Sequence, residues 1–202
     1  MTIVLVVRHG DTFAPGEPVR RIGARSDPPL TAEGRAQAGR LRARLAAGET
    51  TFDEAWTSPL RRTRETAAAL VADIDPVPRT ASWLAEIDHG RDEDRPEVEV
   101  VARIGAGTLA AWDRDAVPPP GWVVDGPARL AAWRGFLARR SAAEGTALMV
   151  TSNGAARFAL LATAELAADA RALPSFKLRT GACGRLVFAG GAWRIDGWDE
   201  RP

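Results

Sequence analysis

The sequence predicts an α/β fold, a three-layer α/β/α sandwich with a mainly parallel central sheet, from three observations. Short uninterrupted apolar runs, at residues 3–7 and 147–150, are typical of strands that are buried on both faces. Segments with helical spacing of apolar residues lie between the predicted strands, so strands and helices alternate along the chain. With 202 residues, 46% of them hydrophobic, the chain suits a single domain over residues 1–202 with a sizeable core.

The first predicted strand ends in the most chemically distinctive residues of the chain. The apolar run at residues 3–7 stops abruptly at Arg8, His9 and Gly10. Ligands of parallel sheets bind just beyond the carboxyl ends of the strands. Gly10 allows a tight turn there, and Thr12 adds a hydroxyl donor beside the imidazole and the guanidinium. We therefore expect a ligand site at this end of the strand.

The next elements follow from local start and stop signals. A helix is predicted to begin at Thr31, a typical capping residue, before apolar residues at helical spacing. A strand at residues 52–57 is followed by Ser58 and Pro59, which predict a helix with proline at its first position. A third strand is predicted over residues 77–83.

The second half of the chain completes the alternating pattern. It predicts helices at 101–112 and 127–142, a strand at 147–151, a helix from Asn153 to about Ala168, and a terminal hairpin of residues 186–189 and 193–198 around Gly190 and Gly191. Trp112, Trp122 and Trp133 are interpreted as packing residues, although one of them could stack on a base or sugar.

Arginines in two segments indicate where an anion binds. Arg61 and Arg62 lie in the first turn of the helix after Pro59, where free backbone N–H groups and the helix dipole also favour an anion. Arg20, Arg21 and Arg25 lie in the predicted loop of residues 13–30, which follows the first strand. Each of these three is most simply a solvated loop residue, but together they hint at a second anionic group on the ligand.

Composition excludes several classes of function. The 27 basic and 26 acidic residues give a formal charge of +1, which argues against nucleic-acid or membrane-surface binding by bulk electrostatics. A single cysteine, Cys183, cannot form an internal disulfide and fits a reducing compartment. The apolar start is shorter than a signal-peptide core, so we expect a cytoplasmic protein. No metal or other cofactor is expected, because no metal-binding cluster or glycine-rich phosphate loop is visible. The oligomeric state stays open.

The residues from Arg8 to Thr12 after an apolar strand resemble the signature of the histidine phosphatase (phosphoglycerate mutase-like) superfamily. Further matches occur in the family's order: Asp27, Leu30, Thr31, Gly34 and Gln37-Ala38; then residues 58–67; then Leu84-Ala85-Glu86 with Gly90 and Glu93. The resemblance covers most of the chain and implies a phosphoglycerate mutase-like fold. A less familiar stretch, at about residues 91–145, corresponds to the family's variable cap.

The resemblance implies a chemistry and assigns residues to it. It implies metal-independent hydrolysis of a small phosphorylated metabolite, in which His9 forms a phosphohistidine and Glu86 is the general acid and base. Arg8 and Arg62 clamp the phosphate, and the family's pattern selects Arg62 over Arg61. Thr12, Asn153 and Gly154 complete the expected substrate-binding set. His89 lies where the family has an aromatic or apolar residue, so we expect it to pack.

One motif departs from the family. Where its members carry a second histidine before glycine, this chain has Asn153 before Gly154. Asparagine offers a neutral amide of similar reach, so we expect a slow or specialised phosphatase. Two alternatives stay open: a degenerate member that binds an anion with altered function, and a mutase that returns the phosphoryl group to a substrate. Asn153 could also simply cap the following helix.

Overall fold

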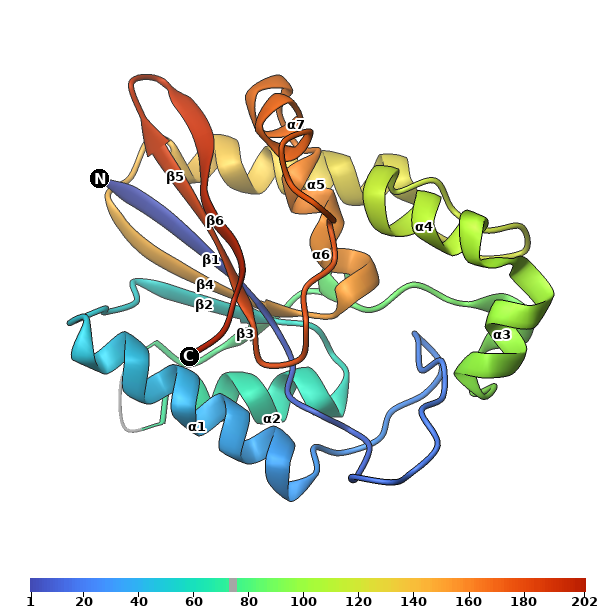
Figure 1. The fold of residues 1–202 in the computed structure, drawn as a ribbon. Coiled ribbons are helices and arrows are strands. Elements are labelled where there is room, and N and C mark those ends of the chain that lie inside the picture. Colours follow the sequence, from blue (N-terminus) through green and yellow to red (C-terminus); the bar gives the residue numbers. More distant parts are fainter. Residues whose placement is uncertain (73–75) are drawn as a thin grey trace.

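The computed structural model describes residues 1–72 and 76–202, and in this part of the chain it shows one six-stranded sheet of order β3-β2-β4-β1-β5-β6 (Figure 1). The strands are β1 (Thr2–Arg8), β2 (Glu54–Thr57), β3 (Arg79–Thr80), β4 (Gly145–Thr151), β5 (Cys183–Ala189) and β6 (Ala192–Glu200). The four strands from β3 to β1 pair in parallel, whereas β5 and β6 are antiparallel to their neighbours. The predicted α/β fold with a mainly parallel sheet is confirmed.

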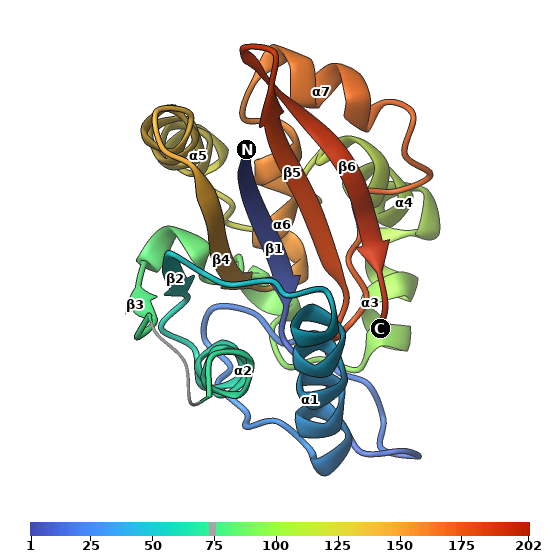
Figure 2. The ribbon, with the colours of Figure 1, turned by 90° about the vertical axis from the view of Figure 1, so that its left-hand side faces the viewer.

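Helices cover both faces of the sheet and make it the middle of three layers (Figure 2). One face carries α1 (Ala32–Ala47) and α2 (Arg61–Leu70), and the other carries α5 (Gly126–Arg140), α6 (Asn153–Leu160) and α7 (Ala164–Ala170). The side chains of alternate residues of β1 point to opposite faces of the sheet. Val4 and Val6 pack in the cluster under α5 and α6, whereas Leu5 and Val7 pack in the cluster under α1 and α2.

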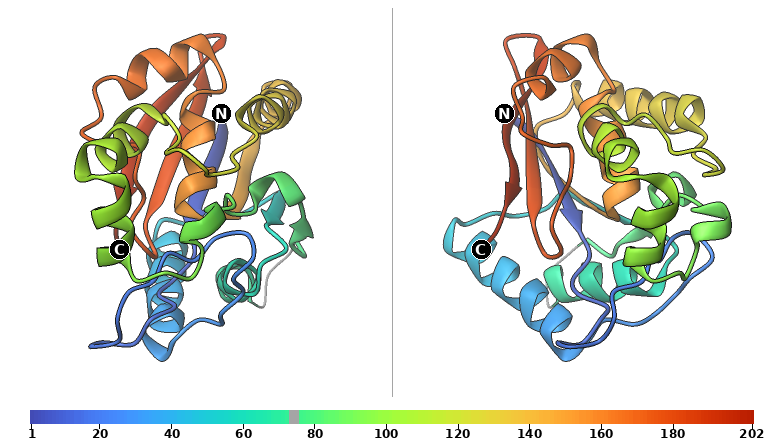
Figure 3. Two further views of the ribbon diagram at one scale, coloured as in Figure 1. Left: turned by 90° about the vertical axis from the view of Figure 1, so that its right-hand side faces the viewer. Right: turned by 45° about the vertical axis from the view of Figure 1, so that its right-hand side comes forward.

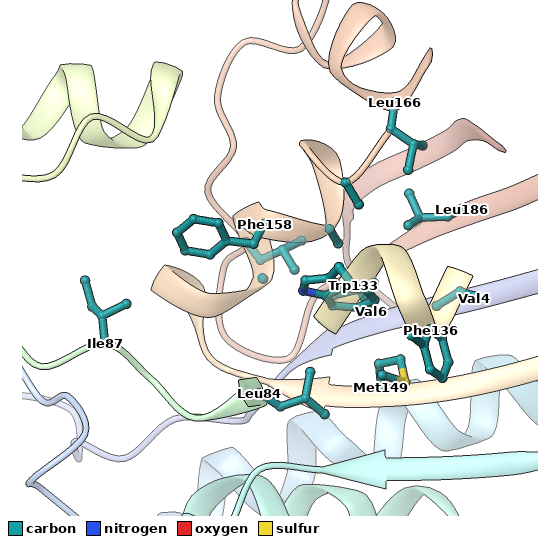
Figure 4. Packing of buried hydrophobic residues seen from close by; sticks show 14 of the residues in the cluster. Val4, Val6, Leu84, Ile87, Trp133, Phe136, Met149, Phe158, Leu166 and Leu186 are labelled. Carbon is teal, nitrogen blue, oxygen red and sulfur yellow. The ribbon is translucent and has the colours of Figure 1, made fainter. Parts of the chain in front are cut away.

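The larger core cluster lies on the α5–α6 face (Figure 4). Trp133 and Phe136 of α5 pack there with Met149 of β4, and Trp133 is fully buried. The interpretation of the tryptophans as packing residues holds, since Trp112 and Trp122 are also buried in this cluster. A densely packed layer of this kind holds the carboxyl ends of β1 and β4 in a defined position.

Two further helices, α3 (Glu97–Ile104) and α4 (Ala106–Asp115), lie beyond the carboxyl ends of β1 and β4 (Figure 3). The single helix predicted at 101–112 is wrong, because the chain breaks at Gly105 with a φ of 89°, a conformation that favours glycine. The single helix predicted from Asn153 to about Ala168 is also wrong. It ends at Leu160, and Thr163 caps α7 by accepting a hydrogen bond from the N–H of Leu166.

Two other boundaries differ from prediction. Helix α2 begins at Arg61 rather than at Pro59, and the hydroxyl of Ser58 accepts the N–H of Leu60 ahead of it. The third strand shrinks to Arg79–Thr80, followed by a 3₁₀ turn at Ser82–Leu84. The terminal hairpin is confirmed, with positive φ at Gly190 and Gly191, as is the cap of α1, where Thr31 accepts from the N–H of Gly34.

Over residues 1–72 and 76–202, no helix combines the length and the apolar character that crossing a membrane requires.

Candidate active site

Hydrogen bonds connect the residues that follow β1 to the neighbouring elements. The N–H of His9 donates to the carbonyl of Thr151 at the end of β4 (3.1 Å), and the N–H of Gly10 donates to the hydroxyl of Thr66 in α2 (3.2 Å). A Cβ atom on Gly10 would lie 2.2 Å from the carbonyl oxygen of Gly34. Gly10 is therefore required for the close approach of α1, and not for the tight turn that we predicted.

The two ring nitrogens of His9 have different partners, and these define its tautomer. Nδ1 lies 2.8 Å from the carbonyl oxygen of Gly10, which only accepts, and Nε2 lies 3.2 Å from Nε of Arg62, which only donates. Nδ1 therefore carries the proton and Nε2 keeps its lone pair. Burial lowers the pKa of His9 well below its ordinary value, and the positive charges of Arg62 and Arg8 lower it further. His9 is thus a neutral imidazole, as a nucleophile must be.

Arg62 is the arginine of α2 that reaches His9. Its side chain is fully buried, and its two terminal nitrogens donate to the carbonyls of Ser26 (2.6 Å) and Gly23 (3.0 Å). Arg61 instead points to solvent and pairs with Glu65 (2.6 Å). The structure therefore agrees with the selection of Arg62 over Arg61.

The carboxylate of Asp27 lies at the start of α2, where we predicted an anion site. The N–H of Arg61 donates to the carboxylate of Asp27 (2.5 Å). A carboxylate at a helix N-terminus is favourable because it offsets the positive end of the dipole. The protein's own side chain thus occupies the position that we had expected a phosphate to take.

The backbone of Leu178 links Arg8 to Asn153. Arg8 donates to the Leu178 carbonyl (2.7 Å), and the Leu178 N–H donates to Oδ1 of Asn153 (2.9 Å). Because a backbone N–H only donates, this contact defines the amide orientation and leaves Nδ2 to donate elsewhere. The helix-cap interpretation is wrong: Ser152 is the N-cap residue of α6, and the Asn153 oxygen is engaged by Leu178.

Glu86 is held as a carboxylate by backbone donors. Its oxygens accept from the N–H groups of Ile87 (2.9 Å) and Gly154 (3.0 Å). Burial acts to raise the pKa of Glu86, but His89, the two N–H donors and Arg62 outweigh it, so the pKa is lowered. The N–H of Gly154, which we expected to bind substrate, therefore serves Glu86.

A cavity of about 710 Å³ opens beside these groups. Its walls include Arg8, Thr12, Glu86, His89, Asn153 and Gly154. His9 and Arg62 lie behind this wall, with exposed fractions of 3% and 0%. The predicted residues therefore come together in space, with Arg62 in contact with His9.

The loop arginines are already paired with carboxylates. Arg20 contacts Asp94 (2.8 Å), Arg21 pairs with Glu97, and Arg25 contacts Asp88 (3.1 Å). Each carboxylate offsets the charge of its arginine. The expectation that these three arginines bind a second anionic group is therefore not supported.

Sequence reasoning missed a residue that supports the site. Arg129 of α5 donates to the carbonyls of Trp83 (3.0 Å) and Ala85 (2.6 Å), and so fixes the segment that carries Glu86. An arginine within a predicted helix gives no local signal of such a role. His89 is buried, as expected, with its ring edge-on to Trp122.

The described residues contain no group of three or more His, Cys, Asp or Glu side chains that could hold a metal ion.

Comparison with known proteins identifies the family. The sequence profile of the histidine phosphatase superfamily (branch 1) matches residues 4–201. The chain belongs to this superfamily. A 2,3-bisphosphoglycerate-dependent phosphoglycerate mutase of Rhizobium etli is 32% identical over 127 residues, which span 60% of this chain and 59% of that protein.

Solved structures of the superfamily share the fold. A mycobacterial glucosyl-3-phosphoglycerate phosphatase, in complex with VO3, has a TM-score of 0.76 at 24% identity, covering 98% of both chains. An Escherichia coli protein described as a putative alpha-ribazole-5'-P phosphatase has a TM-score of 0.71 at 23% identity, covering 100% of this chain and 98% of that one. At these identities the likeness concerns the fold.

Proposed function

We propose that this protein hydrolyses a phosphomonoester of a small metabolite through a phosphohistidine on His9. The observation that carries the proposal is the neutral His9, whose Nε2 lone pair faces Arg62. Among the described residues, neither Arg8 nor Arg62 forms an ion pair with a carboxylate. Their charges are therefore available to a phosphate dianion.

In the first step, phosphate binding moves Arg62 from His9. The Nε donor exchanges the His9 lone pair for a phosphate oxygen, and Arg8 and the Nδ2 group of Asn153 bind from the cavity side. His9 Nε2 then attacks phosphorus in line, forming the N–P bond as the bond to the leaving oxygen breaks. The Gly10 carbonyl stabilises the ring by accepting from its Nδ1 proton.

Glu86 moves the proton in both steps. A phosphate dianion beside this carboxylate raises its pKa, so Glu86 holds a proton when substrate is bound and passes it to the leaving oxygen. The resulting carboxylate then takes a proton from water as the water attacks the phosphohistidine. Inorganic phosphate leaves, and His9 returns to its neutral form. No step requires a metal ion.

The chain forms a single catalytic domain over residues 1–202 in this proposal. The variable cap at about residues 91–145 provides α3 and α4 beside the cavity, whereas α5 packs on the sheet and anchors Glu86 through Arg129. The substrate is a small phosphorylated molecule rather than a nucleic acid or a membrane.

The phosphoenzyme is the direct test. Protein quenched in base during turnover of a reactive aryl phosphate is mapped by mass spectrometry, and we expect a phosphoryl group on His9 that is lost when the sample is acidified. The label should be absent from His9→Ala and present in His89→Gln, which changes the only other histidine. Label at full yield in His9→Ala would overturn the proposal.

Two outcomes would select an alternative. The phosphoglycerate mutase match supports phosphoryl transfer, in which case the labelled phosphoenzyme passes its group to an added phosphoglycerate faster than to water. A degenerate, anion-binding member would bind orthovanadate but form no phosphohistidine and release no phosphate from a panel of phosphometabolites.

A further inference from the structure

A second buried carboxylate, Glu93, lies next to the site but takes no part in the proposed reaction. Its side chain is 7% exposed. One of its oxygens accepts three hydrogen bonds, from the N–H of Gly23 (2.9 Å), the N–H of Arg25 (3.0 Å) and the hydroxyl of Ser26 (2.8 Å). The other accepts from the N–H of His89 (3.2 Å), whose ring nitrogen Nδ1 lies 3.5 Å away.

Glu93 accepts hydrogen bonds from residues 23–26, and the same segment accepts hydrogen bonds from Arg62. The carbonyls of Gly23 and Ser26 accept both terminal nitrogens of Arg62, whose Nε contacts His9. A Cβ atom on Gly23 would lie 2.3 Å from Glu93, so the segment packs directly on the carboxylate. A continuous chain of contacts thus runs from Glu93 through residues 23–26 to Arg62 and His9.

Glu93 keeps its charge throughout the working pH range. Burial acts to raise the pKa of Glu93, but contacts with His89 and Ser26 outweigh it and lower the pKa to about 2. A carboxylate with so low a pKa is a poor proton donor at neutral pH. It is a strong acceptor, and charge-assisted hydrogen bonds of this kind order a loop effectively.

We propose that Glu93 is a positioning residue, which orders residues 23–26 so that the Gly23 and Ser26 carbonyls hold Arg62 at His9. The inference rests on the proposed function only for the role of Arg62 in binding phosphate. The connection between Glu93 and the protonation of His9 is a property of the folded protein, and it can be measured without turnover.

Glu93→Gln removes the charge at nearly constant volume. The amide N–H₂ group must face either His89 or the three donors of residues 23–26, so one side loses its acceptor. We expect orthovanadate affinity and kcat/KM for an aryl phosphate to fall about 10- to 100-fold, as for other residues that orient a ligand-binding group. Asp94→Asn is the matched control, because the side chain of this adjacent residue is 60% exposed and, among the described residues, its carboxylate contacts only Arg20. It should change neither quantity.

The decisive readout is the NMR titration of His9. The chain has two histidines, and His89→Gln assigns the signals. The charged groups that act on His9 are Arg62 and Arg8. If Glu93→Gln lets Arg62 move away from His9, the midpoint of the His9 titration should rise by about one pH unit, because a nearby positive charge has been removed. Simple loss of the Glu93 charge would move it in the opposite direction.

The outcomes separate this inference from the proposed function. Folded Glu93→Gln with unchanged vanadate affinity and an unchanged or lowered His9 midpoint would overturn the positioning role. In an Arg62→Ala background, Glu93→Gln should cause no further loss of orthovanadate affinity and no rise of the His9 midpoint, because both effects act through Arg62. Should Glu93→Gln fail to fold, Ser26→Ala removes one of its donors but keeps the carbonyl, and should give a smaller shift in the same direction. Failure of the wild type to bind vanadate or turn over would overturn the proposed function alone.

Discussion

The arginines at the end of β1 and α2 differ from those of the 13–30 loop in their partners. Arg8 and Arg62 donate to backbone carbonyls and to His9, and burial lowers the pKa of both. Arg20 and Arg21 pair with Asp94 and Glu97. Arg8 and Arg62 have no direct ion pair with a carboxylate among the described residues, whereas each loop arginine contacts one.

This difference shows what makes an arginine available to a ligand. A carbonyl orients a guanidinium without cancelling its charge, so a bound dianion gains the full electrostatic attraction in a buried site. A carboxylate partner must first be displaced, which removes much of that gain. The position of an arginine near a cavity therefore says less about its function than the charge of its partner.

The largest effect that we expect concerns Glu86, the carboxylate nearest to the unpaired arginines. Glu86→Gln should slow hydrolysis of an alkyl phosphate by about 10²–10⁴, the usual contribution of general acid catalysis. Aryl phosphates should lose much less, because their leaving groups depart without a proton. Comparison of kcat/KM for the two esters tests this, and equal losses would show that Glu86 only positions the substrate.

The pH dependence of the same reaction follows from the lowered pKa values of His9 and Glu86. His9 must be neutral, and its lowered pKa keeps it so well into the acid range. Glu86 must be protonated, and that fraction falls as pH rises through its lowered pKa. For an alkyl phosphate, kcat/KM should therefore increase toward acidic pH, and this increase should disappear in Glu86→Gln.

A pair of arginine substitutions tests the comparison directly. Arg62→Ala should lower kcat/KM by about 10²–10³ and weaken orthovanadate binding, because a buried transition-state donor is lost. Arg20→Ala should leave both within about twofold, since it removes only exposed contacts with the carbonyl and the carboxylate of Asp94. Similar losses in the two variants would show that the loop arginines bind phosphate after all.

The smallest effect should come from adding a donor at Asn153. In Asn153→His, Nδ1 can accept the Leu178 N–H as Oδ1 does now, which directs the Nε2 proton toward the cavity. We expect turnover and vanadate affinity to increase, up to about tenfold, because single donors of this kind are worth about 10²–10³ when wholly absent. Asn153→Ala should reduce both. No change in either variant would make the position purely structural.

Local patterns in the sequence determined most of the fold and the location of the site. The buried runs of β1 and β4 and the Gly190–Gly191 turn are visible because side-chain alternation, burial and backbone conformation act over a few residues. The same local logic placed Arg8 and His9 at a strand's carboxyl end. Resemblance to the family added Arg62 and Glu86, which lie on other elements of the chain.

Only the tertiary structure decided where helices break and which charges are neutralised. Gly105 permits the positive φ at the first break and Thr163 caps the helix after the second, but neither residue by itself shows that a helix ends there. The partners of the loop arginines lie 63 to 76 positions away along the chain. Electrostatic interactions depend on distance in space, so the sequence alone could not show which arginines contact a carboxylate and which do not.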